Sequence, residues 1–211
     1  MILANNTLQR EDALAKLFPI QRDDFQALFT AMSPHSVTVR LLDPPMHEFL
    51  PNEHQLLEEI EALKHYLKVA MGQRVTLETL AYQQELPAPF NLLNEEKILE
   101  AINKKKMMLS KVQELYEVNP MLGHRGVRLG MSYPEIYTMQ IRSILEAAAR
   151  CMKQKIPVNP EIMVPQVITV QELKKVTTLV EQIRTEVEEQ YRLKLNFRFG
   201  TMIETVRACT R

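Results

Sequence analysis

The sequence contains few of the residues on which several protein classes depend. Its 211 residues include only two cysteines, Cys151 and Cys209, and five glycines. Two cysteines cannot build a disulfide framework, and this usage is typical of a reducing compartment, so we expect a cytoplasmic protein. Five glycines are few for a complete phosphate-handling enzyme, because backbone phosphate cradles and tight active-site turns use glycine.

Long apolar runs and an excess of one charge are also absent. No stretch of about 18 apolar residues occurs, so no membrane-spanning helix is predicted. Residues 1–10 lack the basic and apolar regions of a secretory signal. The chain has 26 Lys and Arg against 26 Asp and Glu, which argues against nucleic-acid binding because a basic excess supplies most of that affinity. Binding of a small anion needs only two or three cations and stays compatible with this balance.

The composition is typical of one folded domain. Hydrophobic residues make up 45% of the chain and charged residues 25%, which excludes wholesale disorder. A chain of this length is enough for one domain of ordinary size.

Hydrophobic patterning predicts helices that alternate with short strands. Apolar residues at helical spacing indicate a helix over 10–32, which Pro19 is expected to break in two, and helices over much of 52–118 with a loop at 83–91. In the second region, Lys104–Lys106 are expected on a solvated helix face. Strands are predicted at 37–42, 161–168 and 197–204. This alternation predicts an α/β fold with a parallel sheet.

Two later helices carry start signals. Ser132 with Glu135, and Thr169 with Glu172, have the spacing of a capping box. Cys151 falls on the apolar stripe of the first of these helices and is predicted to be a core residue.

Three polar positions are candidates for a binding site because of where they fall. Arg40 precedes the Asp-Pro-Pro break after the first strand, Glu204 ends the last strand, and Arg125 lies in the compact loop 119–128. Binding sites of α/β folds lie at the carboxyl ends of strands. Two guanidinium groups would hold a doubly charged anion, at about 1.5–3 kcal/mol per charge-assisted contact. Glu204 is a natural oxygen ligand for Mg²⁺.

Each position also has an ordinary structural explanation, and the residues alone leave both open. Arg40 would pair with a neighbouring acid such as Asp43. His124 would be a turn residue with an ordinary hydrogen bond, and Glu204 would be a surface carboxylate. The residues alone therefore predict a soluble α/β domain, with anion binding as one of two interpretations.

Four segments, in order along the chain, resemble one enzyme family. They are VTVRLLDPPMHEFLP at 37–51, NPMLGHRGVRL at 119–129, PEIMVP at 160–165 and GTMIE at 200–204. They resemble the pyruvate, phosphate dikinases, within the wider family of PEP-utilising enzymes that includes phosphoenolpyruvate synthase and enzyme I of the sugar phosphotransferase system. Asp-Pro-Pro followed by His-Glu-Phe is the dikinases' own version, which favours the narrower assignment.

The resemblance implies that residues 1–211 are a fragment of the PEP/pyruvate-binding domain, a partial (β/α)8 TIM-type barrel with a helical insertion at about 52–118. It implies that Arg40 and Arg125 bind substrate and that Glu204 binds Mg²⁺, with no catalytic residue in the fragment. The complete, homodimeric enzyme would interconvert ATP, pyruvate and phosphate with AMP, phosphoenolpyruvate and diphosphate. Its phosphohistidine, on a separate domain, would carry the phosphoryl group.

Parts of the family pattern are missing or changed. A further substrate arginine, a second metal-binding carboxylate and the cysteine acid have no counterpart here. Gln166 stands where an apolar residue is expected, and Thr205-Val206 replace Ile-Pro. With roughly three of a barrel's eight strands, the chain is expected to be catalytically incompetent alone. The alternatives are a non-catalytic binding or assembly module, with the helical insertion as its partner surface, and a fragment of phosphoenolpyruvate synthase.

Overall fold

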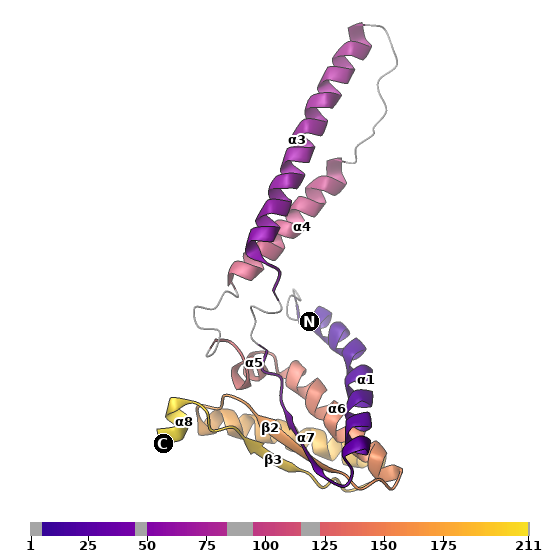
Figure 1. The fold of residues 1–211 in the computed structure, drawn as a ribbon, viewed down its shortest axis with the longest axis vertical. Coiled ribbons are helices and arrows are strands. Elements are labelled where there is room, and N and C mark those ends of the chain that lie inside the picture. Colours follow the sequence, from indigo (N-terminus) through magenta and orange to yellow (C-terminus); the bar gives the residue numbers. More distant parts are fainter. Residues whose placement is uncertain (1–5, 45–49, 84–94, 115–122, 211) are drawn as a thin grey trace. The chain divides into compact units, whose positions relative to one another are not determined.

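The computed structural model describes residues 6–44, 50–83, 95–114 and 123–210 (Figure 1). The chain divides into two compact units. The sheet unit consists of Met1–Pro45 and Asn119–Arg211, and the helical unit consists of Met46–Val118. Among the described residues, no helix is both long and apolar enough to cross a membrane.

Three strands and five helices make up the described part of the sheet unit. They are α1 (Thr7–Met32), β1 (Ser36–Arg40), α5 (Val127–Ser132), α6 (Pro134–Lys153), β2 (Asn159–Val164), α7 (Val170–Tyr191), β3 (Arg198–Thr201) and α8 (Val206–Thr210). The strands are parallel in the order β1-β2-β3, and Ile162 lies opposite Val39 on one side and Phe199 on the other. The predicted α/β fold with a parallel sheet is confirmed.

Helices α6 and α7 cover one face of the sheet, and Figure 1 draws both behind the strands. The inward-facing strand residues Val39, Ile162 and Val164 are buried and alternate with more exposed neighbours. The buried residues of α7 recur every three or four positions and join the same cluster: Val176, Val180, Ile183 and Val187. Cys151 of α6 is fully buried in this cluster, as predicted.

The other face of the sheet carries polar side chains. Thr38 Oγ1 donates a hydrogen bond of 2.6 Å to Glu161 Oε2, and Arg198 Nη1 lies 3.2 Å from Glu161 Oε1. Thr38 and Arg198 are exposed, and Glu161 is half-buried. Chiefly through the Thr38 hydrogen bond, and also through Arg198, the pKa of Glu161 lies below its usual value.

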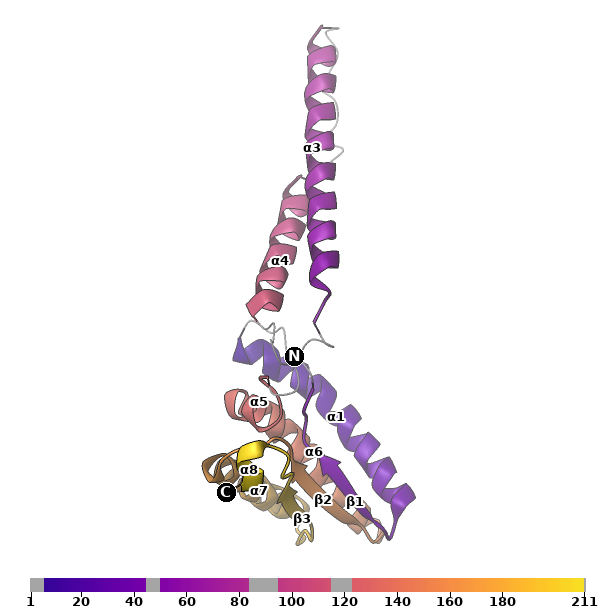
Figure 2. The same cartoon turned by 60° about the vertical axis from the view of Figure 1, so that its left-hand side comes forward.

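Helix α1 is continuous, so the predicted break at Pro19 is wrong. Proline removes one N–H, and its ring crowds the carbonyl four residues earlier, here that of Ala15. Ala15 is exposed, so water can solvate the carbonyl that lacks a helical partner. Figure 2 shows α1 running beside α6, where Leu14 and Phe29 are buried. This packing holds the helix together across the proline.

The two predicted capping boxes have different outcomes. Thr169 accepts from the backbone of Glu172, whose side chain accepts from the Thr169 N–H, so the box that starts α7 is confirmed. The box at Ser132 is wrong, because α6 begins at Pro134 without a side-chain cap. Glu135, the other half of that expected box, instead pairs with Arg10 at 2.6 Å.

The helical unit contains α3 (Glu53–Gln83) and α4 (Glu95–Glu114). Their described contact is a narrow apolar seam made by buried residues: Leu56, Ile60, Ile102 and Val112. Almost all of the predicted loop at 83–91 falls outside the described residues.

Charged groups flank this seam. Lys105 Nζ lies 2.6 Å from Glu59 Oε2, and both side chains are partly exposed, so Lys105 forms a surface ion pair. Lys104 and Lys106 are exposed, as predicted.

Candidate functional site

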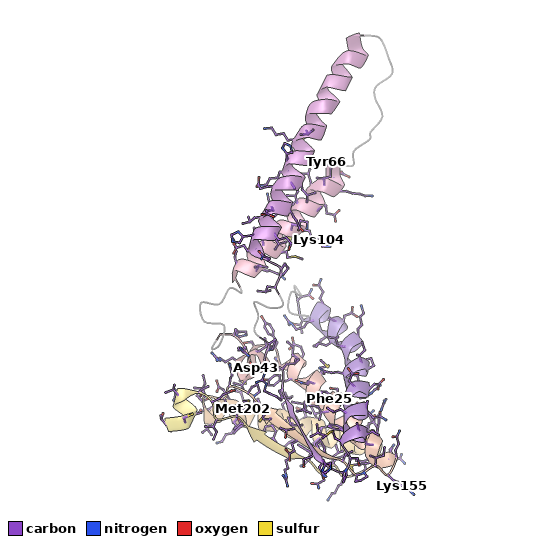
Figure 3. All side chains as sticks on the ribbon, in the orientation of Figure 1. Phe25, Asp43, Tyr66, Lys104, Lys155 and Met202 are labelled. Atoms are coloured by element: carbon purple, nitrogen blue, oxygen red, sulfur yellow. The ribbon has the colours of Figure 1, made fainter. Side chains whose placement is uncertain are left out.

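The candidate site lies where the three parallel strands end. Because the strands run in one direction, the segments that follow them emerge together at one edge of the sheet, the carboxyl edge. Figure 3 labels Asp43 and Met202 at this edge and Lys155 at the opposite end of the sheet unit. The sequence-predicted residues Arg40, Arg125 and Glu204 belong to segments that meet here.

Asp43 and Arg125 form a bidentate ion pair at this edge. Arg125 Nε donates to Asp43 Oδ1 at 2.7 Å, and Arg125 Nη2 donates to Asp43 Oδ2 at 3.0 Å and to the Asp43 carbonyl at 2.9 Å. The Asp43 side chain is 3% exposed and that of Arg125 14%. Removing two charges from water in this way carries a desolvation cost, which the bidentate geometry helps to offset.

Arg40 approaches the same carboxylate from solvent. Its Nη1 lies 3.9 Å from Asp43 Oδ2, and its side chain is 48% exposed. This distance is too long for a hydrogen bond, so the Arg40 fork stays open to another anion. Asp43 thus brings the two candidate arginines to one point, which leaves a net positive charge there.

Helix α6 fixes the segment that carries Arg40 and Asp43. Gln140 Oε1 accepts from the Leu42 N–H at 2.7 Å, and Gln140 Nε2 lies 3.4 Å from the Arg40 carbonyl. The Tyr137 hydroxyl lies 3.4 Å from the Leu42 carbonyl. Burial raises the pKa of Tyr137 well above its usual range, and the nearby Asp43 carboxylate raises it further. Tyr137 is therefore a neutral hydrogen-bond donor rather than a proton-transfer group.

Glu204 reaches the carboxyl edge from the segment after β3. Its Oε1 accepts a hydrogen bond of 2.7 Å from the backbone N–H of Gln166, which follows β2. The Gln166 side chain in turn accepts from Arg128 Nη2 at 2.9 Å. The exposed Glu204 carboxylate is thereby tied to the loop after β2.

Gly126 brings the Arg125 turn against the loop after β2. Its φ is +58°, and a Cβ there would lie 3.0 Å from Gln166 Cβ, 3.1 Å from the Pro165 carbonyl and 3.2 Å from Asp43 Oδ1. The next N–H, of Val127, donates to that Pro165 carbonyl at 3.1 Å. Only glycine combines this dihedral angle with this close approach.

Sequence reasoning did not select Gly126 or Arg128, and it noted Gln166 only as an unexpected polar residue. The available signals were weak: two glycines within four residues at 123–126, and one glutamine in the mostly apolar predicted strand at 161–168. His124 lies in the same turn, with its ring 6.0 Å from that of Tyr133 in an edge-on arrangement.

The described residues at this edge do not by themselves make up a metal site. Among the described residues, no group of three or more His, Cys, Asp and Glu side chains lies close enough to hold a metal ion. The Asp43 oxygens are engaged by Arg125, whereas the Glu204 carboxylate, also at this edge, faces solvent. Mg²⁺ commonly takes one or two carboxylates plus water and substrate oxygens. Glu204 therefore fits as one ligand of a Mg²⁺ ion whose other ligands would be water and substrate oxygens.

A family model and the similar proteins of known name point to the same enzyme family. The family model for the PEP-binding domain of PEP-utilising enzymes matches residues 1–211. The chain is 42% identical over 209 residues to pyruvate, phosphate dikinase of Entamoeba histolytica and 38% identical over 210 residues to that of Giardia intestinalis. It is 40% identical over 208 residues to pyruvate, phosphate dikinase 2 of Zea mays. Each alignment covers 99% of this chain and 20% of the relative, so the chain spans about a fifth of the relatives' length.

Proposed function

Because the chain belongs to the family of PEP-utilising enzymes, through their PEP-binding domain, we propose that it carries part of the phosphoenolpyruvate and pyruvate site of a pyruvate, phosphate dikinase. The complete enzyme would convert ATP, pyruvate and phosphate to AMP, phosphoenolpyruvate and diphosphate. The other domains of such an enzyme, including the phosphohistidine domain, would supply the remaining groups. The chain alone would bind substrate without turning it over.

The observation that carries this proposal is the pair of arginines on Asp43. Arg125 is largely shielded from solvent and oriented by two hydrogen bonds to the Asp43 side chain, and the half-exposed Arg40 presents its fork to solvent beside it. Phosphoenolpyruvate carries a phosphate and a carboxylate, and guanidinium groups match the oxygens of both. Fixed positive charge is what a transferring phosphoryl group and a developing enolate require.

Glu204 would contribute one carboxylate oxygen to a Mg²⁺ ion that the substrate helps to hold. A bound Mg²⁺ supplies charge neutralisation and orientation of the phosphoryl and enolate oxygens. Glu204 Oε1 accepts a hydrogen bond from the Gln166 N–H, so Oε2 would be the oxygen available to hold the ion.

A partial TIM-type barrel is the architecture that best fits the sheet. In a barrel the helices lie on the outer face of the strands alone, whereas a doubly wound sheet has helices on both faces. Here α6 and α7 cover one face, and the face with Thr38, Glu161 and Arg198 is lined by polar side chains. On this proposal the helical region at about 52–118 is an insertion into the barrel.

Calorimetric titration of the chain with phosphoenolpyruvate tests the proposal. We expect binding that requires Mg²⁺ and that weakens roughly 10- to 100-fold in Arg40→Ala, the value of one charge-assisted contact. Arg198→Ala is the matched control, because it removes an exposed arginine from the same sheet and should leave binding unchanged. Equal binding by both variants, or binding without Mg²⁺, would contradict the proposal.

A second candidate function, a non-catalytic assembly module, rests on a different observation. The helical unit exposes large apolar side chains: Tyr66 at 55%, Leu99 at 47% and Met107 at 60%. Such residues are typical of partner surfaces when they gather on one side. A defined homo-oligomer by light scattering, together with no heat of phosphoenolpyruvate binding, would favour this function over the first.

A further inference from the structure

Gln166 holds a backbone conformation that its side chain disfavours. Its φ is +57°, in the left-handed region that non-glycine residues rarely adopt, at a cost of about 1–3 kcal/mol. The residue is only 7% exposed, so the loop is fixed from all sides. Strained residues of this kind cluster at functional sites, where the surroundings hold them in place.

The contacts of Gln166 explain what this conformation achieves. Arg128 Nη2 donates to Gln166 Oε1 at 2.9 Å, and Gly126 packs closely against its Cβ. With the side chain held there, the backbone N–H points at Glu204 Oε1, 2.7 Å away. The strained residue therefore connects α5 with the segment after β3.

A second unexpected polar residue makes the same connection. Thr205, beside Glu204, is 7% exposed and donates through Oγ1 to the Val167 carbonyl at 3.1 Å. Gln166 and Thr205 both stand where the family resemblance predicts apolar residues, and both join the loop after β2 to the loop after β3. An apolar pair at these positions would lose the side-chain hydrogen bonds to Arg128 and to the Val167 carbonyl.

We propose that Arg128 and Gln166 are positioning residues that fix the Glu204 carboxylate for a divalent cation, with Thr205 bracing the same loop. This inference rests on the proposed function of Glu204 as a Mg²⁺ ligand. Carboxylate ligands are oriented by hydrogen bonds from outside the metal's own shell, and loss of such partners commonly lowers metal affinity 10- to 100-fold. On this proposal Arg128 and Gln166 would act on the ion through Glu204 rather than by binding it.

The test compares Mn²⁺ binding, with Mn²⁺ as a paramagnetic probe for Mg²⁺, in the full chain with pyruvate present. Gln166→Gly keeps the backbone N–H and relieves the left-handed strain, but removes the acceptor for Arg128. Arg128→Gln removes the donor. We expect each variant to bind Mn²⁺ about 10-fold more weakly, and the double variant no more weakly than either single one. Arg184→Gln, which loses only a contact with Glu181 on α7, is the matched control.

Stability measurements separate positioning from a merely structural role. Because Gln166→Gly exchanges a hydrogen bond for relief of strain, we expect its unfolding midpoint in urea to stay close to that of the parent chain. A fall in Mn²⁺ affinity without a fall in stability supports the proposal. Unchanged Mn²⁺ affinity in both variants overturns it.

Amide exchange distinguishes failure of this proposal from failure of the proposed function. If the parent chain binds no Mn²⁺, the metal role of Glu204 in this chain fails, and the positioning claim is judged by the Gln166 amide. Arg128→Gln should then accelerate exchange of that amide about tenfold, because its bond to Glu204 would open more often. An unchanged exchange rate would overturn the positioning claim as well.

Discussion

Charged side chains differ in solvent exposure between the two ends of the three strands. At the carboxyl edge, Asp43 and Arg125 are paired away from water. The face of the sheet that α6 and α7 do not cover is here called the open face. On it, nearer the amino ends of the strands, Arg198 is 84% exposed beside Glu161. Exposed ion pairs contribute little, whereas a buried pair must overcome a large desolvation cost. Polar groups kept in the costly environment point to a use at the carboxyl edge that the amino end does not share.

Removal of Asp43 should give the largest effect. Asp43→Ala removes both carboxylate acceptors of this largely desolvated pair, which should lower the unfolding free energy by about 3–5 kcal/mol. Urea denaturation of the purified chain measures this loss. Arg198→Ala, which breaks the exposed pair, should leave the midpoint almost unchanged. If the two variants lost equal stability, the pair at the carboxyl edge would behave as a solvated one, and the contrast would be wrong.

A pair of glycine substitutions compares the turn that holds Arg125 with strand β3. Gly126→Ala should lower the unfolding free energy by about 1–3 kcal/mol, because its φ is positive and a Cβ would press on Gln166 and Pro165. Gly200, in β3, has open space around its Cβ position. Gly200→Ala should therefore be neutral or slightly stabilising. A destabilisation of Gly200→Ala as large as that of Gly126→Ala would contradict this reading.

Substitutions at the amino-terminal ends of helices should have the next smaller effect on the free energy of unfolding. Thr169→Ala removes the confirmed cap of α7 and should lower the unfolding free energy by about 1 kcal/mol. Ser132→Ala should have no comparable effect, because Ser132 is exposed and caps no helix. Thermal unfolding of both variants measures the difference. A loss at Ser132 equal to that at Thr169 would restore the capping box that the sequence predicted.

These paired outcomes show which features local sequence can predict. The box at Thr169 forms because both partners lie within one turn, and the other N–H that bonds to Glu172, that of Ile168, comes from the same turn. The same pattern fails at Ser132, because Glu135 is taken by Arg10, 125 residues away along the chain. Pro19 stays inside α1 for a related reason, since packing against α6 outweighs a local preference. Local patterns hold where no distant residue intervenes.

The site was predictable only in part for the same reason. Alternation of strands and helices places Arg40, Arg125 and Glu204 near one edge, and the family resemblance supplies their expected roles. The sharing of Asp43 by two arginines depends on how β1 and the turn at 125–126 meet, which no local pattern encodes. The left-handed backbone conformation of Gln166 could not be predicted from the sequence either, because glutamine has no preference for that conformation.

The smallest predicted effect concerns the pH dependence of Glu161 on the open face. Its pKa is lowered chiefly by the Thr38 hydrogen bond, so Thr38→Val should move that pKa up toward 4.5. A carboxylate with a lowered pKa contributes stability above its unfolded pKa, and that contribution is lost as the pH falls through the folded value. The stability gap between the parent chain and Thr38→Val should therefore be largest at neutral pH and should narrow below pH 4.5.

Carboxyl carbon shifts of Glu161 in an NMR titration measure this change directly. Thr185→Val is the matched control, because Thr185 bonds to the Glu181 carbonyl on α7 and has no contact with Glu161. An identical Glu161 titration in the parent chain and in Thr38→Val would mean that solvent, rather than Thr38, satisfies the carboxylate. The open face would then differ from the carboxyl edge even more, since its polar contacts would contribute nothing, whereas those around Asp43 would still be held away from water.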